Sequence, residues 1–312
     1  MILFSGDDIM FEQFIATFRK KKLGILVEWE PLAKHTTLRV GGPARILVQP
    51  NDRFAIIESI ELAKELEIKS KIIGKGSNLL VSDDVFNGVV IKTDKGLNYT
   101  IINGTYVTVG AGVSDVKLAR NMAKQGLSGL EFLSGIPGTI GGAVFMNAGA
   151  YLKEMKDILK EVLVLDDDGR LRKLTLKEMD LTYRSSIFHR HPDWLIIEAI
   201  LQLGVGDKDQ LLEIIESRKE KRIETQPLEF PSAGSTFRNP ECCAAWKLIE
   251  KAGLRGFTIG GAMVSNKHTN FVINAGGATA QDIADVILYV KQKIAGECGF
   301  VMHQEVEFFN WD

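Results

Sequence analysis

The chain has 312 residues, 45% of them hydrophobic, and a formal net charge of −2. This length predicts more than one domain, and the near-neutral charge excludes the broad positive field of a nucleic-acid-binding protein. Three cysteines without a CxxC motif argue against a disulfide framework and a zinc site. Residues 1–22 are too charged for a signal peptide, and no uncharged apolar stretch reaches about 18 residues, so we expect a cytoplasmic protein.

The first third of the chain mixes helices, short strands and turns. The spacing of its apolar residues predicts a helix over residues 7–27. Asn51 or Asp52 can cap a second helix that runs to about Glu67. Residues 70–94 are predicted to form three short strands, with a glycine turn after the first.

The middle of the chain shows two hairpin signals. Asn103–Gly104 and Asp168–Gly169 each lie between strand-like segments, and such pairs favour tight turns with positive φ. Between them, Ser114 can cap a helix over residues 115–125. The apolar run at 194–203 is a further predicted strand.

The composition changes near residue 206, where we expect a domain boundary. Residues 207–226 form an amphipathic helix pattern that ends at a proline. A helix over 280–295 begins with a capping box at Thr279, and residues 304–309 form a last strand. Because strands and helices do not alternate as βαβ units, the pattern favours an α+β fold.

Two glycine-rich segments stand out, at residues 74–80 and 134–151. Neither matches the dinucleotide fingerprint or the P-loop. Glycine turns expose successive backbone N–H groups, which can surround a phosphate. Tight turns packed against a core give the same pattern, so the residues alone leave both interpretations open.

Six segments make the interpretation specific: GKGSNLLVSD, SGIPGTIGGAVFMNAGAY, LTYRSSIF, PSAGSTFRNP, KHTNFVINAGGATAQDI and QEVEF. In this order they closely resemble the UDP-N-acetylenolpyruvoylglucosamine reductases, the MurB family, in its compact type II form. The resemblance covers roughly residues 34–308. It implies an α+β fold with an FAD-binding unit of the vanillyl-alcohol-oxidase (PCMH-like) kind and a C-terminal α+β substrate-binding domain. The expected division is an N-terminal helical extension at 1–30, FAD-binding subdomains at 31–95 and 96–205, and a substrate-binding domain at 206–312.

The resemblance also implies noncovalent FAD, held by the two glycine segments. The expected cofactor-binding residues are Gly74, Lys75, Gly76, Ser77, Asn78, Leu79, Ser134, Gly135, Pro137, Gly138, Gly141, Gly142, Asn147, Ala148 and Gly149.

The implied activity belongs to the synthesis of peptidoglycan precursors. NADPH would reduce the flavin, and flavin N5 would pass the hydride to C3 of UDP-N-acetylglucosamine enolpyruvate. Protonation at C2 would then give UDP-N-acetylmuramate. The expected partners are these small molecules, with no nucleic acid, no membrane, no metal and no obligate protein partner.

Three residues match the family's catalytic positions. Arg184 can grip a carboxylate with two hydrogen bonds, Ser235 would protonate C2, and Glu305 would donate a hydrogen bond to the enolate if protonated. Taken without the resemblance, each has a structural explanation. These are a surface arginine, a turn or cap serine, and an outward residue of a terminal strand.

A further set is expected near the substrate: Tyr183, Arg238, Asn239, Lys267, His268 and Asn270, with Arg45 a weaker candidate. A histidine such as His268 is more often structural than a ligand. The chain departs from the family where Leu152 replaces a usual glycine, His35 an asparagine and His303 a glutamate. The first two bear on loop shape, and the third on the protonation of Glu305.

Three alternatives remain at this point. A sugar or alcohol oxidase of the same fold would often tether its flavin through His or Cys, and the glycine segments contain neither. A non-catalytic nucleotide-binding protein would lack turnover, although the three polar residues are present. A metal enzyme is suggested by His189 with His191 and by Cys242 with Cys243, but without ligand spacing.

Overall fold

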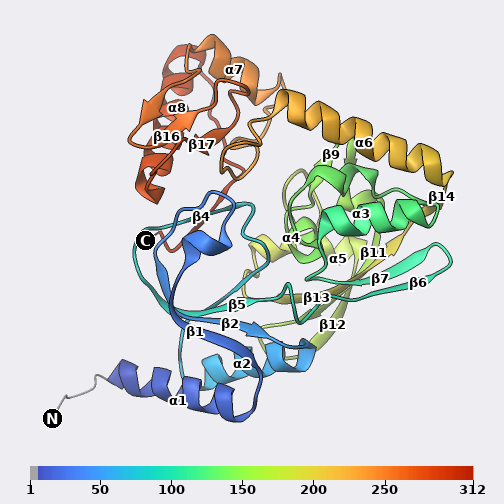
Figure 1. Ribbon diagram of the computed structural model, residues 1–312, viewed down its shortest axis with the longest axis vertical. Helices are drawn as coiled ribbons and strands as arrows, with labels where there is room; N and C mark the ends of the chain where they lie inside the picture. Colours follow the sequence, from blue (N-terminus) through green and yellow to red (C-terminus); the bar gives the residue numbers. More distant parts are fainter. Residues whose placement is uncertain (1–5, 312) are drawn as a thin grey trace. The chain divides into compact units, whose positions relative to one another are not determined.

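The computed structural model describes residues 6–311 (Figure 1). These residues form two compact units. Unit 1 comprises residues 6–30, 44–74 and 87–216. Unit 2 comprises residues 31–43, 75–86 and 217–311. Both units are therefore discontinuous in sequence, whereas the domains expected from the sequence follow one another along the chain. One division between the units falls after Glu30, and the others fall after residues 43, 74, 86 and 216. The predicted domain boundaries at 30, 95 and 205 remain predictions.

The first sheet of unit 1 is formed by four strands in the order β1-β2-β5-β3. They are β1 (Gly24–Pro31), β2 (Pro43–Pro50), β5 (Phe86–Lys92) and β3 (Ser70–Ile73). Helices α1 (Gly6–Lys20) and α2 (Arg53–Glu65) contact each other. The Asp52 side chain accepts a hydrogen bond of 2.8 Å from Ala55 N, so this predicted cap is confirmed.

The predicted helix over residues 7–27 is wrong in its last third. Helix α1 ends at Lys20, and β1 begins at Gly24. Lys22 has a φ of +54° and Gly24 a φ of +156°, which a helix cannot accommodate. A Cβ at Gly24 would lie 2.3 Å from Gln49 O, so the glycine allows β1 to run close beside β2. Residues 1–5 of the expected N-terminal extension lie outside the described residues.

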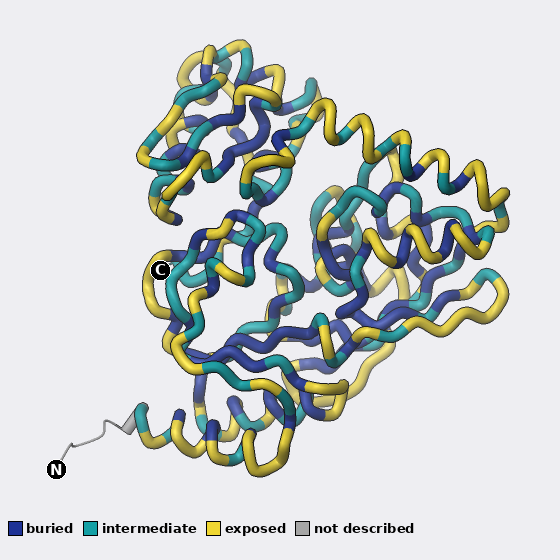
Figure 2. The backbone as a smooth tube through the Cα atoms, viewed as in Figure 1, coloured by how far each residue is buried: buried dark blue, intermediate teal, exposed yellow. Residues whose placement is uncertain are grey.

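The second sheet of unit 1 is antiparallel, with the order β12-β11-β13-β7-β6. Its strands are β12 (Leu171–Thr175), β11 (Leu159–Leu165), β13 (Leu195–Gln202), β7 (Tyr106–Gly110) and β6 (Thr100–Asn103). Both predicted hairpins are confirmed, because Gly104 and Gly169 turn with φ of +60° and +77°. The buried strand β13 and the exposed strand β6 are distinguished in Figure 2.

Helices and short elements complete unit 1. Helix α4 (Ile140–Phe145) contacts β13 and β7, which places the second glycine segment against the sheet. The remaining elements are α3 (Asp115–Lys124), η2 (Glu131–Gly135), η3 (Met155–Asp157), α5 (Leu176–Met179), η4 (Ile187–His189), β8 (Leu127–Ser128), β9 (Gly149–Ala150), β10 (Lys153–Glu154) and β14 (Gly204–Val205). Helix α6 (Lys208–Thr225) crosses the division between the units at residue 216.

Unit 2 is built around its longest helix, α8 (Ala280–Cys298), which contacts a three-stranded antiparallel sheet. The Thr279–Asp282 capping box of α8 is present as predicted. The other elements are η1 (Leu32–His35), α7 (Ala245–Lys251), β15 (Thr258–Ile259), β16 (Ala262–Val264), β17 (Val272–Asn274), β4 (Leu79–Val81) and β18 (Glu307–Phe309). Strands β4 and β18 pair in parallel, which joins the first glycine segment to the end of the chain.

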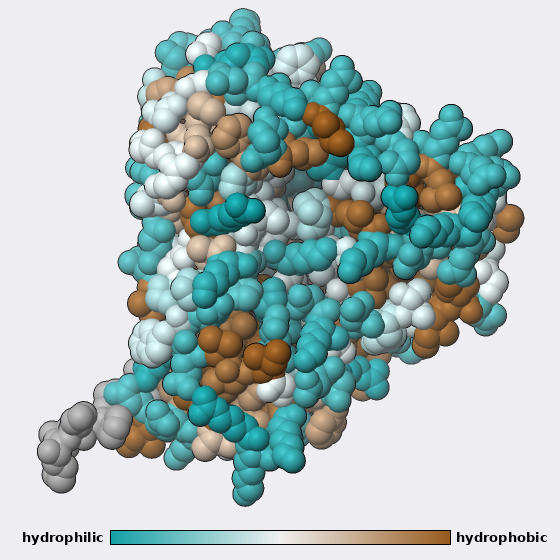
Figure 3. Space-filling model, viewed as in Figure 1, coloured by the Kyte–Doolittle hydropathy of each residue, from teal (hydrophilic) through white to brown (hydrophobic). Residues whose placement is uncertain are grey.

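The last predicted strand, residues 304–309, is only partly correct. Strand β18 begins at Glu307, and Gln304 instead forms an isolated bridge with Phe237. Within residues 6–311, no helix has the length and apolar character needed to cross a lipid bilayer. The face drawn in Figure 3 is mostly hydrophilic, with separate apolar patches.

A strained turn joins β9 and β10. Tyr151 and Leu152 have φ of +55° and +62°, and Ala150 pairs with Lys153 across them. Two consecutive positive φ values belong to the tight hairpin turn that glycine and asparagine favour. Leucine is strained there, and Leu152 is fully exposed, so packing does not offset the strain.

We expect Leu152→Gly to raise the free energy of unfolding by about 1 kcal/mol, because glycine adopts positive φ without a Cβ clash. Thermal or chemical denaturation measures the change. Leu171→Gly is the matched control: Leu171 is also exposed but lies in β12, so it should lose about 0.5–1 kcal/mol. A loss of stability in both variants would contradict the assignment of strain to Leu152.

Candidate active site

The two glycine segments meet within unit 1 at Gly74. A Cβ at Gly74 would lie 2.4 Å from Thr139 Oγ1, so only glycine allows this approach. Thr139 is buried, and its hydroxyl accepts from Gly142 N at the start of α4 at 3.5 Å. Gly141 also packs closely, although less tightly, since a Cβ there would lie 3.0 Å from that of Ala111. The backbone of both segments is thus fixed where they adjoin.

The first glycine segment continues into unit 2 as a turn with available donors. Gly76 has a φ of +62°, and a Cβ there would lie 2.2 Å from His35 O. Within residues 6–311, the backbone N–H groups of Gly76, Ser77 and Asn78 donate to no protein acceptor. Successive unsatisfied N–H groups in a glycine turn are suited to bind a phosphate.

Lys92 supports the start of this segment and was not predicted from the sequence. Its side chain is 7% exposed, and Nζ donates to Gly74 O at 3.2 Å. The ammonium also lies 3.9 Å from Asp94 Oδ2. A lysine is rarely buried without a specific partner, so this position fixes the Gly74 carbonyl with a charge-assisted hydrogen bond.

Asn147 holds the second glycine segment to the turn that carries Arg184. Its fully buried amide donates to Thr182 O at 2.8 Å and to Glu154 Oε2 at 3.1 Å. Its Oδ1 accepts from Lys156 N at 3.0 Å. The Asn147 side chain therefore forms its hydrogen bonds within the protein, and these bonds order the loop that carries Arg184.

Arg184 occupies the second position of a two-residue turn between Thr182 and Ser185. Its φ is +54°, which is uncommon for a residue with a side chain and marks a position that the fold enforces. Its Nη2 donates to Gly149 O at 2.7 Å, and its Cζ lies 5.0 Å from the Tyr183 ring centroid. The guanidinium is therefore held beside the second glycine segment of unit 1.

In unit 2, the segment that carries Ser235 is fixed by Asn270. Asn270 is buried, and its side chain exchanges two hydrogen bonds with the Phe237 backbone, at 3.0 and 2.9 Å. The backbone carbonyl of Asn270 accepts from Thr236 N at 2.8 Å. The Ser235 hydroxyl makes no hydrogen bond to any other residue in 6–311, so it can donate to a bound molecule.

Glu305 is connected to both neighbouring segments. Its N–H donates to Thr236 O at 2.8 Å, which brings its backbone next to Ser235. Its carbonyl accepts from Asn78 Nδ2 at 2.9 Å. Unit 2 thus brings together the backbone of Ser235, Glu305 and the first glycine segment, three positions that are distant in sequence.

Arg238 and Asn239 follow the Ser235 segment. Within the described part of the chain, Arg238 Nε is buried without a hydrogen-bond partner. Burying an N–H donor without an acceptor costs free energy, and a bound ligand can supply the missing acceptor. The buried Nε is therefore compatible with substrate binding. Asn239 Oδ1 instead accepts from Ala245 N at 2.9 Å and so satisfies the first N–H group of α7.

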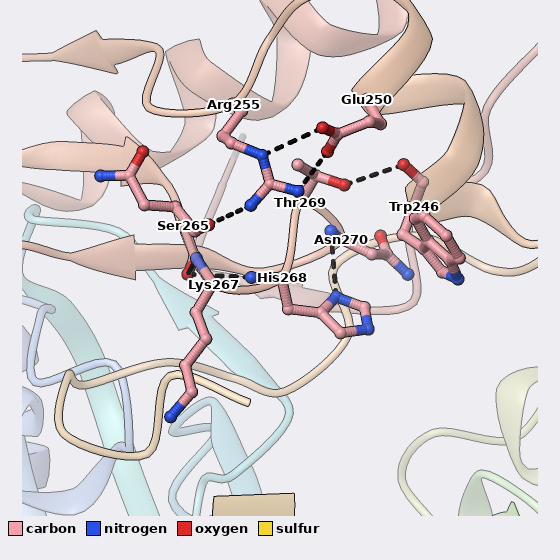
Figure 4. Close-up of polar contacts among 9 residues, drawn as sticks. Trp246, Glu250, Arg255, Ser265, Lys267, His268, Thr269 and Asn270 are labelled. Atoms are coloured by element: carbon pink, nitrogen blue, oxygen red, sulfur yellow. Dashed lines mark hydrogen bonds and ion pairs between the residues drawn. The ribbon is translucent and has the colours of Figure 1, made fainter. Parts of the chain in front are cut away.

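The loop from Ser265 to Asn270 carries the other predicted substrate residues (Figure 4). Lys267 Nζ donates to Ile223 O at 2.6 Å, and His268 Nδ1 accepts from Asn270 N at 3.3 Å. Arg255 donates to both carboxylate oxygens of Glu250 and to Asn266 O, which anchors the loop. Burial lowers the pKa of His268 below 6.5, and the charge of Arg255 acts in the same direction.

The other predicted residues have local roles. Ser134 Oγ donates to Glu131 O at 2.7 Å, Gly138 O accepts from Asp115 N at 3.3 Å, and Ala148 N donates to Ala143 O at 2.8 Å. Arg45 forms an ion pair with Asp8 and stacks on Phe11 within unit 1. No group of three potential metal ligands occurs among residues 6–311.

Comparison with known proteins agrees with this arrangement. A family model of an FAD binding domain matches residues 44–175, and a model of the UDP-N-acetylenolpyruvoylglucosamine reductase C-terminal domain matches residues 226–309. The reductase of Bacillus velezensis is 47% identical over 296 residues, covering 95% of this chain and 98% of the relative. The chain belongs to the UDP-N-acetylenolpyruvoylglucosamine reductase family. The Bacillus subtilis reductase is 45% identical with the same coverage.

A solved reductase has the same fold. The crystal structure of MurB from Thermus caldophilus matches with a TM-score of 0.77 and 34% identity, over 92% of this chain and 98% of that one. The predicted family, the α+β fold, the FAD-binding unit and the assignment as an oxidoreductase are therefore confirmed. FAD is compatible with the residues present, because the glycine segments offer closely packed turns and unsatisfied N–H groups.

We expect Lys92→Met to weaken FAD binding roughly tenfold, because it removes a charge-assisted hydrogen bond of about 1.5–3 kcal/mol from Gly74. Fluorescence titration of the apoprotein with FAD measures the dissociation constant. Lys95→Met is the matched control, since Lys95 is exposed and donates to Asn51 instead. Equal affinities in the two variants would show that Lys92 does not support the cofactor site.

The lowered pKa of His268 predicts a contribution to acid sensitivity. Below about pH 6.5 the unfolded chain binds a proton that native His268 resists, so stability falls as pH decreases. Above that pH both forms are neutral, and the contribution vanishes. His268→Gln should therefore lose less unfolding free energy than the wild type between about pH 7 and about pH 5. His303→Gln, at an exposed position, serves as the control.

Proposed function

We propose that the protein uses NADPH and FAD to reduce UDP-N-acetylglucosamine enolpyruvate to UDP-N-acetylmuramate, in the synthesis of peptidoglycan precursors in the cytoplasm. Family membership supports the reaction, and the reductase names of the relatives support the substrate. The observation that carries the proposal is the position of Arg184. Its backbone adopts a strained positive φ, and its charged side chain is held beside the second glycine segment by the hydrogen bond to Gly149 O.

The proposed cofactor site uses backbone donors more than charge. The N–H groups of Gly76, Ser77 and Asn78 would hold the pyrophosphate. The other cofactor-binding residues expected from the resemblance would contact FAD through their backbones. When bound, FAD supplies the hydride that NADPH provides and that C3 of the substrate receives.

The protein then has to stabilise charge that develops on the substrate. After hydride addition at C3, negative charge spreads from C2 onto the carboxylate of the enolpyruvyl group. Arg184 would grip that carboxylate, because a guanidinium stays charged at working pH and offers paired donors. The bond from Arg184 to Gly149 O fixes the head group before the substrate arrives.

Protonation at C2 requires a donor on one face of the substrate. Ser235 is suited to this role, since its hydroxyl makes no competing hydrogen bond within residues 6–311. Glu305, whose backbone is tied to Thr236, would stabilise the enolate as a hydrogen-bond donor. Arg238, with its buried Nε, would bind the anionic part of the substrate, as would Tyr183, Asn239, Lys267 and His268.

Asn270 was expected near the substrate, but its side chain forms hydrogen bonds within the protein. Two backbone hydrogen bonds to Phe237 engage its side chain, and we propose that it acts by positioning Ser235. Asn147 has the equivalent relation to Arg184.

Measuring the two half-reactions separately distinguishes residues that serve the cofactor from residues that act on the substrate. We expect anaerobic NADPH to bleach the flavin band near about 450 nm, and the enolpyruvyl substrate to restore it. Arg184→Ala, Ser235→Ala and Glu305→Gln should each slow the return by roughly 10²–10⁴-fold and spare the bleaching. Stopped-flow absorbance measures both phases.

The matched controls are Arg170→Ala, Ser217→Ala and Glu297→Gln, three exposed positions that should keep both rates. Bleaching that oxygen reverses but the substrate does not would identify an oxidase and overturn the substrate assignment. A protein that binds FAD but resists NADPH would indicate the non-catalytic alternative.

A further inference from the structure

The proposed reaction uses none of the three cysteines, yet all of them lie in unit 2. Cys242 and Cys243 precede α7, and Cys298 is the last residue of α8. Helices α7 and α8 contact each other, and Cys243 and Cys298 pack against the same apolar core. Cys242 is exposed, whereas Cys243 and Cys298 are half-buried.

Cys242 and Cys243 form a close pair of thiols. Their Sγ atoms lie 3.3 Å apart and share a hydrogen bond. A disulfide bond measures about 2.05 Å, so oxidation would need the sulfurs to approach by only about 1.2 Å. The local backbone is a turn in which Cys243 N donates to Pro240 O at 3.3 Å.

The order of reaction follows from the surroundings of the two sulfurs. The hydrogen bond to Cys242, then burial, raises the pKa of the Cys243 thiol, which keeps it protonated. Cys242 is the more exposed of the two residues. A small oxidant therefore meets Cys242 first, with Cys243 already in contact to complete the reaction.

A disulfide between neighbouring residues is easily reversed. Consecutive Cα atoms are about 3.8 Å apart, below the range from about 4.4 Å that disulfides usually span. The ring is therefore strained, and strained, exposed disulfides are the ones that cellular thiols reduce. Such a bond is suited to a reversible modification and not to structural reinforcement.

We propose that Cys242 and Cys243 are a reversible thiol oxidation site that reacts with low-molecular-weight disulfides. The Cys242 thiolate attacks one sulfur of the small disulfide, forms a mixed disulfide and releases one thiol. Cys243 then gives its proton to solvent, and its sulfur displaces the second thiol from Cys242. The protein loses two electrons, and the small disulfide becomes two thiols.

The oxidised pair would stiffen a turn that belongs to the candidate site. Asn239 and Ala245 lie on either side of it, joined by the hydrogen bond from Ala245 N to Asn239 Oδ1. Arg238, with its buried Nε, directly precedes this turn. The modification itself does not depend on the proposed reaction, and its test requires no substrate.

Mass spectrometry of the purified holoprotein tests the proposal. The protein is equilibrated with graded mixtures of oxidised and reduced glutathione, quenched in acid, alkylated and digested with trypsin. Cleavage after Arg238 and Lys247 places Cys242 and Cys243 in one peptide, and cleavage after Lys293 places Cys298 in another. We expect the first peptide to lose two hydrogen atoms in mass, reversibly with dithiothreitol, while Cys298 remains alkylated.

Variants separate the roles of the three sulfurs. Cys243→Ser should stop at a glutathione adduct on Cys242, and Cys298→Ser, the matched control, should oxidise as the wild type does. A cross-link between the two tryptic peptides would overturn the proposal, and so would a persistent glutathione adduct in the wild type. Failure of the pair to oxidise before Cys298 reacts would also overturn it. Because the wild-type result decides, a poorly folded variant leaves the test intact.

Discussion

The buried carboxamide of Asn147 is the interaction on which the reactive part of unit 1 depends. The segments it joins have only the short β9–β10 ladder and an isolated bridge, so their other backbone groups need another partner. One amide supplies two donors and an acceptor, and it satisfies Thr182, Glu154 and Lys156 at once. Arg184 can therefore hold a strained backbone, because the groups around it are already fixed.

Unit 2 repeats this solution with a different residue. Asn270 joins an irregular segment to Phe237, and Glu305 is attached to the same segment through Thr236. In both units a buried asparagine holds a loop, while a neighbouring residue offers its functional group. Asparagine suits this role, since its planar amide can donate and accept like a peptide group without carrying charge.

Local signals in the sequence predicted much of the fold. Asp52, Thr279 and the Asn103–Gly104 turn act within a few residues, so their effect does not depend on distant contacts. The helix predicted over 7–27 failed where tertiary packing decides, because Gly24 has to approach β2. Apolar spacing alone could not show this, since the same residues suit a helix or a strand.

The candidate site was predicted from motifs, and its supports were not. Lys92 follows a run of apolar strand residues, and a lysine at the end of a strand is usually exposed; its burial arises from contact with Gly74. Asn147 and Asn270 were expected to touch ligands, and sequence patterns cannot distinguish such residues from those that hold a loop. The available signal for a loop-holding role was an asparagine among apolar residues inside a glycine-rich motif.

The interleaving of the two units also constrains how the protein is made. Strand β4, near residue 80, pairs in parallel with β18, near residue 308, and Asn274 donates to Leu38 O across a similar separation. Unit 1 contains no described residue beyond 216. All strands of unit 1 can therefore leave the ribosome before β18, the partner of β4, is synthesised. During that interval the apolar residues of β4, Leu80 and Val81, lack the strand that later covers them. Translation thus imposes an order in which unit 1 is complete before the segments that carry Ser235 and Glu305 exist.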